Sequence, residues 1–135
     1  MIKNFAELTL ETQFSFETCI SSQQIEQFAA ICGDHNPLHM NAGYAIEKGF
    51  SNQVVHGLLS SSFFSQLIGM HLPGDRALIL DCNLRFRNPI YPDEKVEVSG
   101  KVTNISESTQ SFELKTLIKN ASQKKVSGKF NIKLI

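Results

Sequence analysis

A carboxylate and an imidazole lie five residues apart in the segment Gly33-Asp34-His35-Asn36-Pro37-Leu38-His39. If the proline-bearing loop holds them rigidly, Asp34 can accept a proton from a water molecule that His39 orients or reprotonates. Such general acid–base chemistry needs groups that titrate near neutral pH. Because an exposed aspartate does not, we expect Asp34 to lie in a buried or apolar setting. Asn36 is expected to fix the loop through its side-chain amide, as asparagine does in turns.

A catalytic role is not the sole possibility for this segment. An aspartate after a helix-ending glycine is common in turns, and a histidine near a proline is often a surface residue. His35 and His39 also have the four-residue spacing of two zinc ligands on one helix face. Pro37 spoils that helical geometry, however, and no glutamate follows His35 as a HExxH site requires. We therefore expect no metal here.

A second motif, Val54-Val55-His56-Gly57, opens a largely apolar segment that is predicted to be a buried helix over His56–Met70. The first amides of a helix lack partners and lie at the positive end of its dipole. They can stabilise negative charge on a thioester oxygen as an enolate develops. Gly57 has no side chain to block a carbonyl from these amides, although selection for helix packing alone would account for the glycine equally well.

The remaining sequence predicts the elements that must position these motifs. An amphipathic helix begins at Ser21–Ser22, buries the stripe Ile25, Phe28, Ala29 and Cys32, and ends at Gly33. A short helix over 42–48 follows, with Asn41 as its cap and Gly49 at its end. Five strands are expected, and they cover residues 8–20, 76–86, 95–106, 110–120 and 125–135.

Alternation of apolar and polar residues along the later strands indicates an antiparallel sheet with one buried face. The strands follow one another without intervening helices, so the fold class is α+β rather than βαβ. The packing solution is a sheet of about five strands wrapped around the apolar helix, in a single domain over residues 1–135.

Composition excludes several other classes. Hydrophobic residues make up 41% of the 135 residues, and 13 basic and 13 acidic side chains cancel, so neither disorder nor a nucleic-acid partner is expected. The pair Lys124-Lys125 is interpreted as a solvated turn. Three scattered cysteines indicate reduced thiols, and the first residues lack a signal-peptide pattern. We expect a cytoplasmic protein without a membrane segment.

Together the two motifs resemble the signature of the MaoC-like, (R)-specific enoyl-CoA hydratases. The likeness comprises the Asp34–His39 segment, Phe50, and Val54 to Gly57. It continues through Leu58 to Gly69, the turn Leu72-Pro73-Gly74 and the segment Leu84 to Ile90, and so covers most of the chain.

The resemblance implies a hot-dog fold and a homodimer or higher homo-oligomer, with substrate entering near the subunit interface. It implies that Asp34 and His39 hold the catalytic water and that Gly57 gives its amide to the thioester oxygen. Asn36, Ser65 and His56 are expected to support the loop or the substrate. The implied reaction interconverts trans-2-enoyl and (3R)-3-hydroxyacyl thioesters of coenzyme A or an acyl carrier protein. It needs no cofactor beyond water.

Asn41 stands where the family often has an aspartate, so one supporting charge is missing. Arg85 and Arg87 could meet carrier phosphates, but as alternate residues on a strand they could equally be solvated. Two alternatives to the hydratase remain. A non-catalytic acyl-thioester-binding subunit is disfavoured by the intact Asp34–His39 pair. A hot-dog thioesterase is disfavoured because His56–Met70 contains no acidic residue.

Overall fold

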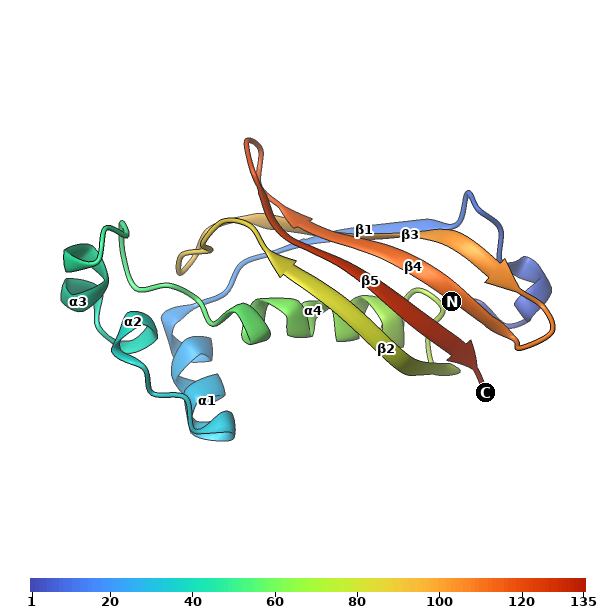
Figure 1. Ribbon diagram of the computed structural model, residues 1–135, viewed down its shortest axis with the longest axis horizontal. Coiled ribbons are helices and arrows are strands. Elements are labelled where there is room, and N and C mark those ends of the chain that lie inside the picture. The colour runs from blue at the N-terminus through green and yellow to red at the C-terminus, as the bar shows by residue number, and fades with distance from the viewer.

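In the computed structural model, which describes all residues from Met1 to Ile135, a curved antiparallel sheet lies over one long helix. The strands are ordered β1-β3-β4-β5-β2, so β1 and β2 form the two edges. Figure 1 shows α1, α2 and α3 gathered beyond the end at which α4 begins, with both termini near the other end. The elements are η1 (Phe5–Glu7, a 3₁₀ turn), β1 (Gln13–Thr18), α1 (Ser22–Cys32), α2 (Pro37–Met40), α3 (Ala42–Glu47), α4 (Gly57–Met70), β2 (Ala77–Phe86), β3 (Val96–Ser106), β4 (Ser111–Lys119) and β5 (Lys124–Leu134).

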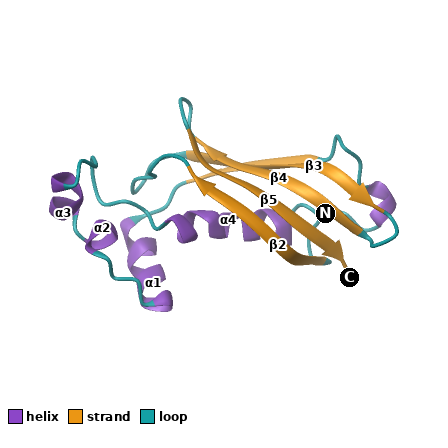
Figure 2. Cartoon of the chain, viewed as in Figure 1, coloured by secondary structure: helices purple, strands orange, loops and turns teal.

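The core lies between α4 and the concave face of the sheet (Figure 2). Phe64, Leu67 and Ile68 of α4 are fully buried against inward-facing side chains of β3, β4 and β5. A Cβ at Gly100 of β3 would lie 2.8 Å from Leu67 Cδ2, so this glycine lets the helix approach the sheet closely. The expected α+β arrangement, a five-stranded antiparallel sheet around an apolar helix, is confirmed.

The helix ends follow the sequence signals. Ser21 accepts a hydrogen bond from the Gln24 amide at 3.2 Å, and Gly33 closes α1 with a φ of 80°. Asn41 caps α3 through the Tyr44 amide at 2.9 Å. The prediction that Cys32 belongs to the buried stripe of α1 is wrong. Cys32 is exposed, because the last turn of α1 extends past the sheet.

Several boundaries differ from the prediction. Of the strand expected over residues 8–20, only Gln13–Thr18 pairs with β3, because Thr9 and Thr12 close a hydrogen-bonded turn before it. The short helix α2 was not predicted. It starts at Pro37, where the missing amide would have no helical partner in any case. β2, expected to be half-buried, is exposed along most of its length because it is an edge strand.

No helix has the length and hydropathy needed to cross a bilayer. All three cysteines are free and exposed.

Lys125 corrects the prediction of a solvated turn at Lys124-Lys125. Lys124 is exposed, but Lys125 is only 3% exposed. Its ammonium lies 2.8 Å from Glu94 Oε1 and donates to the Pro89 carbonyl at 2.9 Å. The segment between β2 and β3 folds over this side chain, and composition alone gives no sign of that coverage.

Glu94 is held in its charged form by the same contacts. Burial would raise the pKa of Glu94, but hydrogen bonds from Lys125, the Tyr91 amide and Asn120, together with the charge of Lys125, lower it below its ordinary value. A lowered folded-state pKa means that the pair stabilises the fold fully above the unfolded-state pKa, and that this stabilisation is lost as the pH falls through the folded value.

Replacing Lys125 with methionine is expected to lower the free energy of unfolding by about 3 kcal/mol, because Glu94 then keeps a partly buried charge without its partner. Lys124→Met is the matched control, and it should change stability by less than about 0.5 kcal/mol. Urea unfolding at pH 7 measures both. Equal effects of the two substitutions would contradict the assigned pair, as would a Lys125→Met deficit that does not shrink in acid.

Candidate functional site

The turn after α1 presents the carboxylate of Asp34 in a fixed direction. The Asn36 amide donates to Asp34 Oδ1 at 3.1 Å, and the Leu38 amide donates to Asn36 Oδ1 at 2.9 Å. These bonds tie the loop into the start of α2. Asp34 Oδ2 makes no hydrogen bond and lies 3.8 Å from His39 Nε2 and 4.0 Å from His56 Nε2. Asn36 therefore fixes the loop through its side-chain oxygen.

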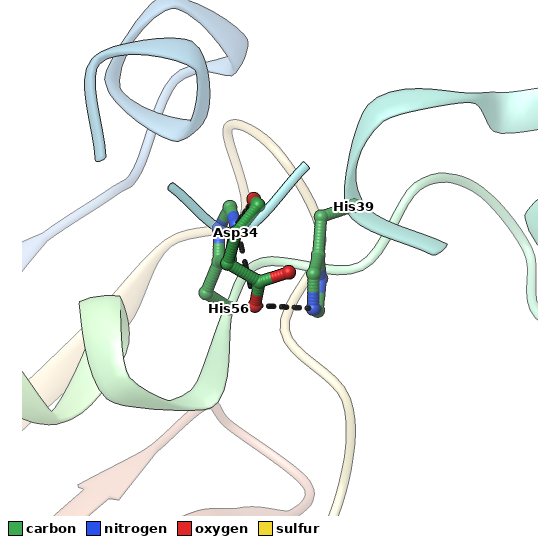
Figure 3. Close-up of side chains that lie close together, drawn as sticks. All are labelled: Asp34, His39 and His56. Carbon is green, nitrogen blue, oxygen red and sulfur yellow. Dashed lines mark hydrogen bonds and ion pairs between the residues drawn. The ribbon is translucent and has the colours of Figure 1, made fainter. Parts of the chain in front are cut away.

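His39, on α2, is oriented by a backbone carbonyl. Its Nδ1 lies 2.7 Å from the Val54 oxygen, and because a carbonyl only accepts, Nδ1 carries the proton. The lone pair of the neutral ring is then on Nε2, which lies 3.8 Å from Asp34 Oδ2 (Figure 3). That gap is too long for a direct hydrogen bond. Two atoms at this separation can both hydrogen-bond to one water molecule that lies about 2.8 Å from each.

His56 is the third member of the cluster in Figure 3. It is 2% exposed, its Nε2 donates to the Asp34 carbonyl at 3.0 Å, and its ring stacks on that of His39 with centroids 4.0 Å apart. Its buried Nδ1 has no partner. His56 thus holds the Asp34 backbone and the His39 ring in place, and it does not line the neighbouring cavity.

Ligand-capable atoms of Asp34, His39 and His56 lie within 4.8 Å of one another. The hydrogen bond to the Asp34 carbonyl uses His56 Nε2 as a donor, so that nitrogen has no lone pair for a metal. Asp34 and His39 alone supply two ligands, fewer than the three or four protein ligands that zinc sites use. The donor pattern gives no support for a metal centre.

Beside His39 lies a mostly apolar cavity of about 430 Å³. It is lined by His39, Phe50, Val54, Val55, Gly57, Leu58, Ser60, Phe86, Arg87, Asn88, Pro89, Ile90 and Val126. Gly57 begins α4 at this wall. No side chain caps the helix, and the amide of Gly57 has no acceptor within the chain. These free donors can meet negative charge in the cavity.

Two site expectations differ from the structure. The side chain of Asp34 is 49% exposed rather than buried, because it lies on the turn after α1 at the surface of the molecule. Ser65 is exposed two turns along α4 and does not line the cavity. Ser60 lines it instead, and its hydroxyl donates to the Gly57 carbonyl at 2.7 Å.

Phe86 is a site residue that the sequence pattern did not reveal. A Cβ at Gly57 would lie 2.8 Å from the Phe86 ring, so the glycine accommodates this ring as well as leaving the amide accessible. Asn88 and Pro89, which follow the strand predicted over residues 76–86, also form cavity wall. The sequence feature that could have identified Phe86 is an aromatic side chain at the end of the strand predicted over residues 76–86.

Gly57→Ala is expected to cost about 1 kcal/mol of stability, because the new methyl group displaces the Phe86 ring. Adding Phe86→Leu should recover most of that cost. Thermal unfolding of the wild type, the two single variants and the double variant measures the recovery. Strictly additive effects would show that the two residues do not compete for space.

The chain resembles known proteins in both sequence and fold. The family model described as "MaoC like domain" matches residues 5–124. The solved (R)-hydratase of A. caviae involved in PHA biosynthesis superposes with a TM-score of 0.90 at 29% identity, over 95% of this chain and 98% of that one. The unliganded R-hydratase PhaJ1 from Pseudomonas aeruginosa superposes with a TM-score of 0.89 at 28% identity, over 96% and 84% of the two chains.

Curated relatives match over shorter stretches. The (R)-specific enoyl-CoA hydratase of Aeromonas caviae is 36% identical over 84 residues, 62% of this chain and 63% of that protein. The mitochondrial 3-hydroxyacyl-[acyl-carrier-protein] dehydratase of Arabidopsis thaliana is 40% identical over 76 residues, 56% of this chain and 45% of that protein. The matches span less than two thirds of these relatives' own lengths. Since the family model matches most of this chain, the chain belongs to the MaoC-like domain family and has the hot-dog fold.

Proposed function

We propose that the chain interconverts trans-2-enoyl and (3R)-3-hydroxyacyl thioesters by adding or removing water. The observation that carries the proposal is the 3.8 Å separation of His39 Nε2 from Asp34 Oδ2, beside an apolar cavity that begins at the free amide of Gly57. The names of the Aeromonas and Arabidopsis relatives describe a hydratase and a dehydratase, in support of the same reaction class.

In hydration, the bound water donates one O–H to Asp34 Oδ2 and the other to His39 Nε2, so its lone pair faces C3 of the substrate. As the C3–O bond forms, the Asp34–His39 pair takes one proton from the water and supplies one proton to C2. The Gly57 amide stabilises the negative charge that develops on the thioester oxygen between these events. Dehydration follows the same path in reverse. The acyl chain occupies the apolar cavity, and no organic or redox cofactor enters.

The chain acts as a homodimer in this proposal, with residues 1–135 as one domain. β2 is an edge strand whose large apolar side chains are exposed, among them Leu78, Leu80 and Phe86. A free apolar edge of this kind pairs with another strand. Leu58 and Met70 extend the apolar surface onto α4.

Leu80→Arg is expected to convert the dimer to a monomer, because it places a charge in the paired edge. Sedimentation of the wild type and the variant measures the change. A monomeric wild type would contradict the proposed dimer, while leaving the chemistry of the Asp34–His39 pair to be tested separately.

The chemistry is tested by the loss of absorbance of crotonyl-CoA and longer enoyl thioesters on hydration. Asp34→Asn and His39→Ala should each lower kcat by about 10² to 10⁴-fold, the range for a lost acid–base group. His35→Ala is the matched control, since His35 is exposed in the same loop and absent from the cavity. It should keep wild-type activity.

Failure of the wild type on every chain length, with both carriers, would contradict the hydratase proposal and favour a non-catalytic acyl-binding subunit. Release of free thiol from the thioester would instead identify a thioesterase. Asp34→Asn and His39→Ala variants that are both as active as the wild type would leave the reaction but overturn the assigned pair.

A further inference from the structure

The outer face of the sheet carries three lysines in register across three strands. Lys101 of β3 pairs with Lys115 of β4, which pairs with Lys129 of β5. Like charges directly opposite one another destabilise a sheet, and opposite charges at these positions would stabilise it. The chain has a net charge of zero and as many acidic as basic side chains, so the row reflects placement rather than composition.

The same face is hollowed near the β2 end of this row. Five cations and a single carboxylate lie among the lining residues, which include Arg85, Arg87, Lys115, Lys124, Lys129 and Glu113. Glu113 is already engaged, by Lys129 at 3.5 Å and by the Thr103 hydroxyl at 2.9 Å. Lys115 and Lys124 have no carboxylate within ion-pair distance. The hollow therefore presents unneutralised positive charge.

Arg87 connects this hollow to the proposed active site. It lines both the basic hollow and the apolar cavity that contains His39. Its Nε donates to the Ser127 hydroxyl at 2.9 Å, which fixes the guanidinium at the boundary between the two. A ligand bound over the basic face can thus contact a residue that also lines the cavity.

We infer that this basic face docks an acidic carrier protein, whose phosphate-linked thioester arm enters the cavity past Arg87. The inference rests on the proposed function and chooses a carrier protein over coenzyme A. Together with Lys101, whose ammonium lies 3.8 Å from Glu11 Oε2, the cations are spread over the four neighbouring strands β3, β4, β5 and β2. Three strand spacings amount to about 14 Å. Phosphate groups of a nucleotide are held by converging donors. A broad, mainly positive surface instead suits the encounter of two protein surfaces.

The test compares crotonyl-acyl carrier protein with crotonyl-CoA as substrates of the dimer. Lys115→Glu should lower kcat/KM for the carrier-protein substrate by about tenfold or more, mainly through KM, and leave the value for crotonyl-CoA unchanged. Because the new carboxylate lies between two lysines, thermal stability should be retained or increased. Lys133→Glu, exposed on β5 and outside the hollow, is the matched control and should affect neither substrate.

Equal losses on both substrates, or none on the carrier-protein substrate, would overturn the inference, as would an equal loss in Lys133→Glu. If the wild type hydrates neither substrate, the proposed function fails but the docking surface is still testable. Titration of the chain with holo-acyl carrier protein should then show salt-sensitive binding that Lys115→Glu abolishes, and no binding by the wild type would refute the surface as well.

Discussion

The hydrogen bond from His39 Nδ1 to the Val54 carbonyl determines which nitrogen of the ring can act. It commits Nδ1 as a donor and so turns the lone pair of Nε2 toward Asp34. Val54 is itself fixed, because its amide donates to the Leu38 carbonyl at 3.0 Å and the next amide, of Val55, donates to the Ile90 carbonyl at 2.9 Å. The geometry of the pair therefore depends on an extended segment that is bonded on both sides.

The hydrogen bonds that hold Val54 and Val55 connect to the ion pair between Lys125 and Glu94. Lys125 donates to the Pro89 carbonyl, directly before the Ile90 carbonyl that holds Val55. One wall of the cavity and the orientation of His39 thus share a single connection between β2 and β3. Gly57 is constrained in two ways. Its amide must stay accessible from the cavity, and its lack of a side chain must accommodate the ring of Phe86.

The sequence was sufficient for features that depend on local pattern. Alternation along the strands, the Ser21 cap, Gly33 and the apolar segment that forms α4 are local signals, and each gave the correct element. Asp34 and His39 could be singled out because only four residues separate them and a proline restricts the loop. Features that depend on distant chain segments could not be predicted. Lys125 is buried by a connection in which its partner Pro89 lies 36 residues earlier, and the exposure of β2 follows from its place at the sheet edge. Ser65 was placed by resemblance alone, and the helical turn carries it away from the cavity.

The central claim is that Asp34 and His39 act on one shared water. The most direct test is the double variant Asp34→Asn/His39→Ala, with kcat measured beside both single variants on the same enoyl thioester. Groups that act as a unit have non-additive effects, so the double variant should be no more than about threefold slower than the slower single variant. A double variant whose loss equals the product of the two single losses would show that the two side chains act independently, and would contradict the shared-water mechanism.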